Sequence, residues 1–177
     1  MVSGWRLIPW DGVAATSRGR DAQGRGRGRC GGRRAVGALG PAMLRVAGEL
    51  ADGTITTWAT ASALADHIVP EITKAAGGRT PRVVAGTIVC VTSHEDERRA
   101  WVAENFGMVG QAPIYRAMLD RGHAAGPQGA VVIGDETAVE RQIRRLFDAG
   151  ATELVALPLG SEEEQARTTA LLADLAG

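Results

Sequence analysis

The chain has 177 residues, of which 45% are hydrophobic and 23% are charged, and its formal net charge at pH 7 is zero. This length provides enough apolar side chains for one domain with its own core. Because no run of about 18 apolar residues occurs, we expect no membrane-spanning segment, and the first ten residues are too polar for a secretory signal. The two cysteines, Cys30 and Cys90, have no metal-ligand spacing, which favours a reducing cytoplasmic location.

The zero net charge hides an uneven distribution of charge along the chain. Residues 1–34 contain eight arginines against two aspartates, and residues 17–34 alone hold seven arginines and six glycines. Such a segment buries too little apolar surface to fold, so we expect residues 1–34 to be disordered. A basic arm of this kind can bind RNA phosphates, but it lacks the Phe or Tyr residues that would stack on bases. Nucleic-acid binding is therefore the weaker interpretation of this segment.

From Ala35 onward, segments typical of strands alternate with segments typical of helices. The strand segments are rich in apolar and β-branched residues. They cover residues 35–39, 54–58, 82–91, 131–133 and 153–157. The helical segments have apolar residues at three- and four-residue spacing. With their capping residues, they cover residues 41–51, 62–76, 93–106, 113–119, 135–149 and 161–177.

Several helix boundaries carry local signals. Pro41 suits the first turn of a helix, where its missing N–H would be unpaired in any case. Pro70 is expected to kink or split the second helix, and Gly150 to end the fifth. The acidic run of residues 162–164 is interpreted as a solvated helix start. Capping residues are predicted at Ser62, at Ser93 with Asp96, at Asp135, and at Ser161 with Glu164.

Strands that alternate with helices predict an α/β fold with a parallel sheet and right-handed crossovers. About five strands are predicted, which is too few for a closed eight-stranded barrel, and residues 35–177 are fewer than the roughly 250 that such a barrel takes.

Three separated blocks of sequence resemble the luciferase-like monooxygenase superfamily and, within it, the branch that uses the deazaflavin coenzyme F420. They read LGPAMLRVAGELADGTI, RVVAGTIVCVT and VVIGDETAVERQIRRLFDAGATELVALPLG, and they occur in the family's order. The resemblance implies that residues 35–177 are the C-terminal part of a (β/α)8 TIM barrel whose first half is absent. Residues 1–34 do not resemble the family.

The resemblance also implies where a cofactor, F420 or alternatively FMN, would be held. Its phosphate end would lie at the turn and helix start formed by Leu39, Gly40, Pro41, Ala42 and Met43. The residue types agree with this role. Glycine permits close approach of the backbone, and the first N–H groups of a helix are unpaired and attract anions.

Thr57 and Trp58 match the carboxyl end of the next barrel strand, so the resemblance implies a substrate-side position for both. The same rim is where barrels hold their active sites. Packing alone is the other interpretation of Trp58. Tyr115 and Arg116 belong to a segment that can cover the barrel mouth, whereas Trp101 is interpreted as a core residue.

No side chain is assigned as a catalytic acid, base or nucleophile. No metal site is predicted, because the acidic residues after His94 fit the first turn of a helix. The resemblance implies an F420-dependent oxidoreductase that transfers hydride between the deazaflavin and a small organic substrate. The alternatives are a non-catalytic barrel remnant that self-associates through open strand edges, and nucleic-acid binding through the Arg/Gly-rich segment.

Overall fold

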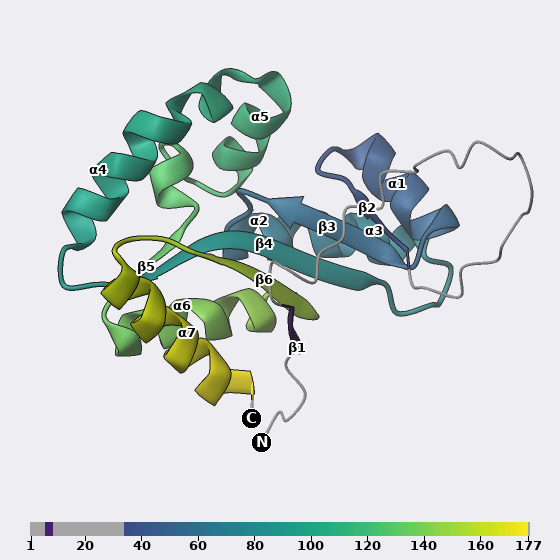
Figure 1. The fold of residues 1–177 in the computed structure, drawn as a ribbon. Helices are drawn as coiled ribbons and strands as arrows, with labels where there is room; N and C mark the ends of the chain where they lie inside the picture. Colours follow the sequence, from purple (N-terminus) through teal and green to yellow (C-terminus); the bar gives the residue numbers. More distant parts are fainter. Residues whose placement is uncertain (1–5, 9–33, 177) are drawn as a thin grey trace, which may run out of the picture.

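A computed structural model of the chain describes residues 6–8 and 34–176 (Figure 1). The five predicted strands and the predicted helices are confirmed, with boundaries that shift by a few residues. The strands are β1 (Arg6–Ile8), β2 (Ala35–Gly37), β3 (Gly53–Thr57), β4 (Arg82–Val91), β5 (Val132–Gly134) and β6 (Glu153–Pro158). The helices are α1 (Pro41–Leu50), α2 (Ala61–Ala63), the π turn η2 (Leu64–Ile68), α3 (Val69–Ala75), α4 (Glu95–Phe106), η3 (Gly107–Gln111), α5 (Pro113–Arg121), η4 (Pro127–Gly129), α6 (Glu136–Asp148) and α7 (Glu162–Ala176).

All strand pairs of the described sheet are parallel, as predicted, and the strand order is β1-β6-β4-β3-β2 with β5 beside β4. The long strand β4 holds the sheet together. Residues 82–86 of β4 pair with β3, residues 84–89 with β6, and residues 89–91 with β5. This strand is almost continuously apolar, which suits a position covered on both faces.

Strand β1 was not among the predicted elements. It pairs with β6 in the register Arg6↔Glu153, although residues 1–34 were expected to be disordered. The backbone of β6 offers an open edge to pair with, and such pairing requires no periodic pattern in a strand of three residues. The Arg/Gly-rich segment, apart from Arg34, lies outside the described residues.

The two faces of the sheet are covered differently. Residues of β4 such as Val83, Ala85, Val89 and Val91 share one apolar core with side chains of α1, α3, α6 and α7. The opposite face carries a second, smaller core, in which Ile88 and Cys90 pack against Val102 of α4. In Figure 1, α4 and α5 lie above β4, while α6 and α7 lie below it. The part of this second face before Ile88 is not covered by α4.

At the amino ends of the central strands, Arg82 of β4 and Glu153 of β6 form a two-pronged ion pair. The distances are 2.6 Å from Nε to Oε1 and 2.5 Å from Nη2 to Oε2. The Glu153 side chain is only 6% exposed, and the hydrogen bond to its carboxylate raises the pKa of the Arg82 guanidinium. This pair ties β4 to β6 at the end of the sheet that lies away from the candidate site.

Two predicted helix caps are confirmed. Asp135 caps α6 by accepting a hydrogen bond from the N–H of Ala138 at 2.8 Å. At α7 the N–H of Ser161 donates to Oε2 of Glu164 at 2.7 Å, while the N–H of Glu164 donates to Oγ of Ser161 at 3.3 Å. These are the two reciprocal bonds of a capping box.

Two other predicted caps are wrong. The cap of α2 is Thr60, whose Oγ1 accepts from the N–H of Ala63 at 3.3 Å, and not Ser62. Helix α4 begins after His94 with no side-chain cap, so Ser93 and Asp96 do not form a capping box. The N–H of His94 donates instead to the hydroxyl of Thr92 at 3.0 Å, and this turn delays the start of the helix.

Pro70 was predicted to kink or split the second helix, and this helical segment is divided into α2, the π turn η2 and α3. Pro70 stands in the first turn of α3, directly after η2. Gly150 ends α6 with a positive φ of 97°, as predicted. Among the described helices, none has the length and the apolar composition that crossing a bilayer requires.

Candidate functional site

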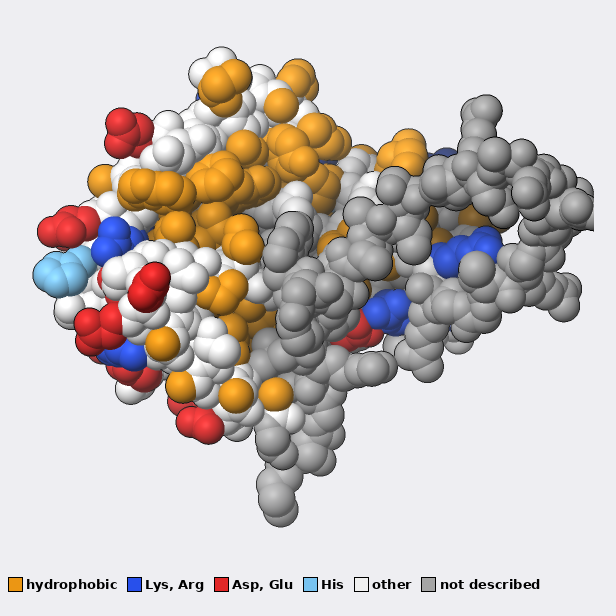
Figure 2. Space-filling model, viewed as in Figure 1, with side chains coloured by type: hydrophobic (Ala, Val, Ile, Leu, Met, Phe, Trp, Pro, Cys, Tyr) orange, Lys and Arg blue, Asp and Glu red, His pale blue; other side chains and the backbone are white. Residues whose placement is uncertain are grey.

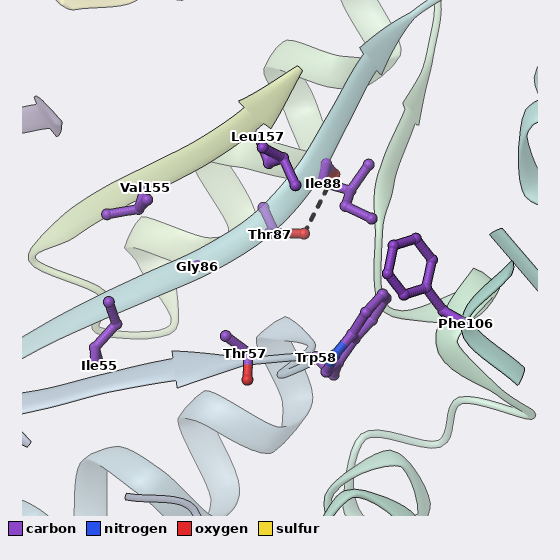
Figure 3. Close-up of a pocket in the computed structure, with 9 residues that line it drawn as sticks. All are labelled: Ile55, Thr57, Trp58, Gly86, Thr87, Ile88, Phe106, Val155 and Leu157. Atoms are coloured by element: carbon purple, nitrogen blue, oxygen red, sulfur yellow. Dashed lines mark hydrogen bonds between the residues drawn. The ribbon is translucent and has the colours of Figure 1, made fainter. Parts of the chain in front are cut away.

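Among the described residues, the part of the second face that α4 does not cover forms an apolar hollow along three adjacent strands (Figure 3). Its volume is about 170 Å³. Alternate residues of β3 and β6 point into it, because successive side chains of a strand face opposite sides of the sheet, and β4 contributes three consecutive residues. The lining residues are Ile55, Thr57, Trp58, Gly86, Thr87, Ile88, Phe106, Val155 and Leu157.

Apolar side chains continue from the hollow onto the surface around it. Figure 2 shows a band of hydrophobic side chains across the face that carries α4 and α5. The exposed large side chains include Trp101, Met108, Ile114 and Leu157. Trp101 is 40% exposed, so its prediction as a core residue is wrong. A helix that lies over only one end of the sheet leaves one of its apolar sides open to solvent.

Trp58 is held at the rim of the hollow by both its backbone and its ring. Its φ of 58° lies in the left-handed region, where a bulky residue costs about 1 kcal/mol or more. Its ring centroid is 5.2 Å from that of Phe106, which in turn is 6.0 Å from that of Trp101. Trp58 therefore has both positions that the sequence suggested: it lines the hollow, and it packs against the core beneath α4.

Among the residues that the structure describes, the lining contains no ionisable side chain, and its polar side-chain groups are the hydroxyls of Thr57 and Thr87 and the indole N–H of Trp58. The hydroxyl of Thr87 lies 3.3 Å from the carbonyl oxygens of both Ile88 and Ala130. Its hydrogen atom is therefore already used in hydrogen bonds to the backbone. The methyl group of Thr57 faces Gly86, and Figure 3 shows its hydroxyl directed away from β4. These described residues can hold a flat apolar ring system, and none of them is an acid or a base.

Gly86 is required where β3 and β4 approach each other. A Cβ at this position would lie 2.8 Å from the carbonyl oxygen of Thr56 and 3.5 Å from Cγ2 of Thr57. Any side chain would push the two strands apart, so the glycine keeps this part of the floor of the hollow flat.

The predicted cofactor turn lies at the neighbouring strand end. Strand β2 pairs with β3 in the register Gly37↔Ile55, so the chain leaves β2 beside the hollow and enters α1 through residues 38–40. Three successive carbonyl oxygens of this turn accept hydrogen bonds. Thr54 Oγ1 donates to Ala38 at 3.1 Å, His67 Nε2 to Leu39 at 3.0 Å, and the N–H of Leu44 to Gly40 at 2.9 Å.

The donors of this turn, in contrast, are left open. Among the described residues, no group accepts a hydrogen bond from the backbone N–H of Gly40, Ala42 or Met43, and no side chain caps α1. Pro41, Ala42 and Met43 are exposed, and the first turn of α1 contains no acidic residue. These exposed N–H groups at the positive end of a helix form a surface that suits a phosphate.

The start of α7 has the opposite character. The Glu164 carboxylate is buried and accepts from the hydroxyl of Thr92, from Arg98 Nε at 3.1 Å and from the N–H of Ser161. Burial raises the pKa of Glu164, but the hydrogen bonds from Arg98, Thr92 and Ser161 outweigh it and lower this pKa from 4.5 to about 2. The prediction that residues 162–164 are a solvated helix start is therefore wrong for Glu164.

Two further candidate groups do not contribute to a site. Cys90 is buried beneath α4, and burial, with the nearby charge of Glu164, raises the pKa of its thiol to about 11. His94 Nδ1 lies 3.8 Å from Oε1 of Glu97 on the surface. Within residues 6–8 and 34–176, no group of three or more His, Cys, Asp or Glu side chains has the arrangement of a metal site.

The structure therefore distributes the predicted site residues over two adjoining places. Thr57 and Trp58 line the hollow, while Leu39, Gly40, Pro41, Ala42 and Met43 form the turn after β2 and do not line it. Tyr115 is not among the lining residues, and Arg116 pairs with Asp120 on the surface at 3.5 Å. The sequence reasoning missed the other lining residues, which are Ile55, Gly86, Thr87, Ile88, Phe106, Val155 and Leu157. Alternation along β3 and β6 would have indicated Ile55, Val155 and Leu157, whereas Phe106 depends on how α4 folds back.

Comparisons with known proteins agree with this geometry. The family model for luciferase-like monooxygenase matches residues 33–170. Solved structures that match include the coenzyme F420 dependent tetrahydromethanopterin reductase of Methanopyrus kandleri, at 23% identity and a TM-score of 0.54 over 78% of this chain and 49% of that one. An F420-dependent secondary alcohol dehydrogenase in complex with an F420–acetone adduct matches at 17% identity and a TM-score of 0.51, over 69% of this chain and 42% of that one.

A structure that contains FMN matches similarly well. The oxygenating constituent of 3,6-diketocamphane monooxygenase from Pseudomonas putida gives 20% identity and a TM-score of 0.50, over 73% of this chain and 43% of that one. A comparison with curated proteins gives no match. The chain spans about half the length of the solved structures that it matches. Its fold is part of a luciferase-like TIM barrel, and the chain belongs to the luciferase-like monooxygenase family.

Proposed function

We propose that this chain provides part of an oxidoreductase site for a flavin-type cofactor, with F420 as the first candidate and FMN as the alternative. The observation that carries the proposal is the pairing of an apolar hollow with an uncapped helix start on the neighbouring strand. The ring system would lie in the hollow and the phosphate at the turn of residues 39–43. The sequence blocks that resemble the F420-dependent branch support F420 over FMN.

The residues of the hollow suggest what this chain does in the reaction. When bound, the deazaflavin or flavin supplies the hydride chemistry. The chain's own residues hold the rings between the strand floor and the Trp58–Phe106 pair, which excludes water from one side. The described lining residues include no ionisable group, so a proton that the reaction requires would come from the substrate, from solvent or from residues outside this lining. The substrate is a small organic molecule that approaches at the rim, near Thr57 and Trp58.

Filling the hollow tests this proposal. Leu157 lines the hollow and is 39% exposed, so Leu157→Trp should block the ring site without removing a core side chain. The matched control is Leu50→Trp at the exposed end of α1, where Leu50 is 79% exposed. F420 and FMN are titrated separately, and binding is followed by the change in their absorption and fluorescence. We expect Leu157→Trp to weaken binding about ten-fold or more, and Leu50→Trp to leave it unchanged.

The outcomes separate the hypotheses. Tighter binding of F420 than of FMN supports the deazaflavin branch, and the reverse order supports the flavin alternative. If the unaltered chain binds neither compound, or if both tryptophan variants bind equally well, the proposed site is wrong.

We also propose self-association as a second candidate function. The supporting observation is that β1 and β2 stand at the two ends of the described sheet, each with one unpaired edge. Next to β2, helix α1 exposes Met43, Val46 and Leu50, which follow one another at three- and four-residue spacing along one side of the helix. Such a side is typical of a contact with another chain.

Sedimentation at several protein concentrations tests this second candidate. We expect a reversible increase in mass with concentration, which the double variant Val46→Lys, Leu50→Lys reduces because it places two charges in the contact. A single monomeric species at every concentration would contradict self-association.

A further inference from the structure

His67 stands in an unusual place for a histidine. It belongs to the π turn η2, and its Nε2 lies 3.0 Å from the carbonyl oxygen of Leu39, the residue directly before Gly40. Because a carbonyl oxygen only accepts hydrogen bonds, Nε2 must carry a proton and donate it. The side chain is half-buried, and the bond crosses from one helical segment to the turn that begins another.

The sequence explains why the ring is held at this position. Pro70 has no N–H to donate, and its ring would clash with the carbonyl group four residues earlier in a regular α-helix. The π turn precedes it, with the N–H of Val69 bonded to the carbonyl oxygen of Leu64. Leu64 and Ile68 on either side of His67 are fully buried in the core that also contains Ala38 and Leu44. Helices with such π turns frequently carry functional residues.

The hydrogen bond from His67 fixes the carbonyl group of Leu39 and, with it, the N–H group of Gly40 in the same peptide. No peptide bond of the described residues is cis, so the Leu39–Gly40 peptide is trans and its C=O and N–H point in opposite directions. With the carbonyl directed at His67, the N–H of Gly40 is directed away from η2. The bonds from Thr54 to Ala38 and from Leu44 to Gly40 hold the peptides on both sides.

We propose that His67 is a positioning residue for phosphate binding, and that its bond to Leu39 orients the N–H of Gly40 toward the phosphate of a nucleotide-like ligand. This inference rests on the proposed function, because it takes the turn of residues 39–43 as the phosphate site. It assigns to His67 no contact with the reacting atoms. The donors that this inference assigns to the phosphate are the N–H groups of Gly40, Ala42 and Met43, for which no acceptor is found among the described residues.

The test compares ligands with and without the phosphate. FMN differs from riboflavin only in the phosphate, so the ratio of these two affinities reports the phosphate contact. F420 is compared with its deazariboflavin core, from which it differs by the phosphate and the side chain attached to it. The full chain is used with three variants. His67→Leu removes the donor, His67→Gln keeps an N–H donor at similar reach, and His94→Leu is the matched control at an exposed histidine that does not contact the turn.

We expect His67→Leu to lower the affinity ratio about five-fold, the effect of one lost hydrogen bond, while His67→Gln restores it and His94→Leu leaves it unchanged. In the unaltered chain, the amide signal of Gly40 in a ¹H–¹⁵N NMR spectrum should shift more with FMN than with riboflavin. This measurement needs no variant, so a Gly40 amide that responds equally to FMN and riboflavin overturns the inference even if His67→Leu does not fold.

Two different failures are distinguishable. If the unaltered chain prefers the phosphorylated ligands but the ratio in His67→Leu is unchanged, or the Gly40 amide responds equally to FMN and riboflavin, the role of His67 is wrong and the proposed function stands. If the unaltered chain binds none of the four ligands, the proposed function fails and the inference fails with it.

Discussion

Helices α1 and α7 both begin where a parallel strand ends, after β2 and β6, but their first turns differ in what they do with their free N–H groups. At α7 the Ser161–Glu164 capping box uses these groups within the chain, and three glutamates occupy the first turn. At α1 the first turn contains neither a cap nor an acid, and its N–H groups are exposed. The first N–H groups of a helix that follows a strand can therefore be bonded within the chain, as at α7, or stay available to a ligand, as at α1. A few residues in the first turn decide between the two.

The largest expected effect is at the closed helix start. Glu164→Gln removes the charge that compensates Arg98, whose side chain is 28% exposed, and weakens the bonds to Thr92 and Ser161. Breaking such a partly buried pair should lower the free energy of unfolding by about 3 kcal/mol. Urea denaturation measures it. The neighbouring substitution Glu163→Gln, at an exposed residue, should have almost no effect, and similar losses in both variants would show that the network contributes little.

The same carboxylate predicts a dependence of stability on pH. Its pKa is lowered from 4.5 to about 2 in the folded chain, so the unfolded chain binds its proton first as the pH falls. The stabilisation is therefore complete above about pH 4.5 and is lost progressively toward pH 2. Unfolding free energies of the unaltered chain and of Glu164→Gln should converge over this range. A difference between the two that stays constant with pH would contradict the assignment.

A smaller effect is expected where the open helix start is closed artificially. Gly40→Ser provides a capping hydroxyl at an N-cap whose backbone is already extended, and the new Cβ would lie 3.4 Å from Cδ1 of Ile114, a tolerable contact. Stability should rise by about 0.5 kcal/mol. The affinity for FMN should fall about five-fold relative to riboflavin, because the cap takes an N–H from the phosphate.

Gly37→Ser is the control for this variant, since a Cβ at Gly37 meets no atom within 4 Å. It changes the unfolded chain in the same way but adds no cap. If both variants lose the preference for FMN over riboflavin, or if neither does, the proposed difference between the starts of α1 and α7 is wrong.

Much of the fold follows from local sequence, because apolar runs and turn residues act over a few positions. The strands and the caps at Asp135 and Ser161 were predicted correctly on this basis. The cap predicted at Ser93 failed because the hydroxyl of Thr92 turns the chain first, and Thr92 is itself held by Glu164 from a helix 72 positions later. Such a contact leaves no local signal.

The candidate site divides in the same way. The turn of residues 39–43 was predicted from adjacent residues, and its phosphate role stays a prediction. Most of the hollow was not predicted, since Thr57, Gly86 and Val155 meet only when three strands pair, and Phe106 reaches them from a helix in between. The exposure of Trp101 was missed for the same reason, because it depends on how much of the sheet α4 covers.

The reactivity of the buried Cys90 thiol can report how often helix α4 opens. The thiolate, and not the thiol, is the nucleophile that reacts with alkylating reagents, and a pKa of about 11 leaves almost no thiolate at neutral pH. Cys90 packs beneath Val102 of α4, so a reagent reaches the thiol only when this helix separates from β4 by local unfolding. In a chain that carries Cys30→Ser, the rate of modification would measure how often α4 opens, and a ligand that lies against Phe106 should slow it.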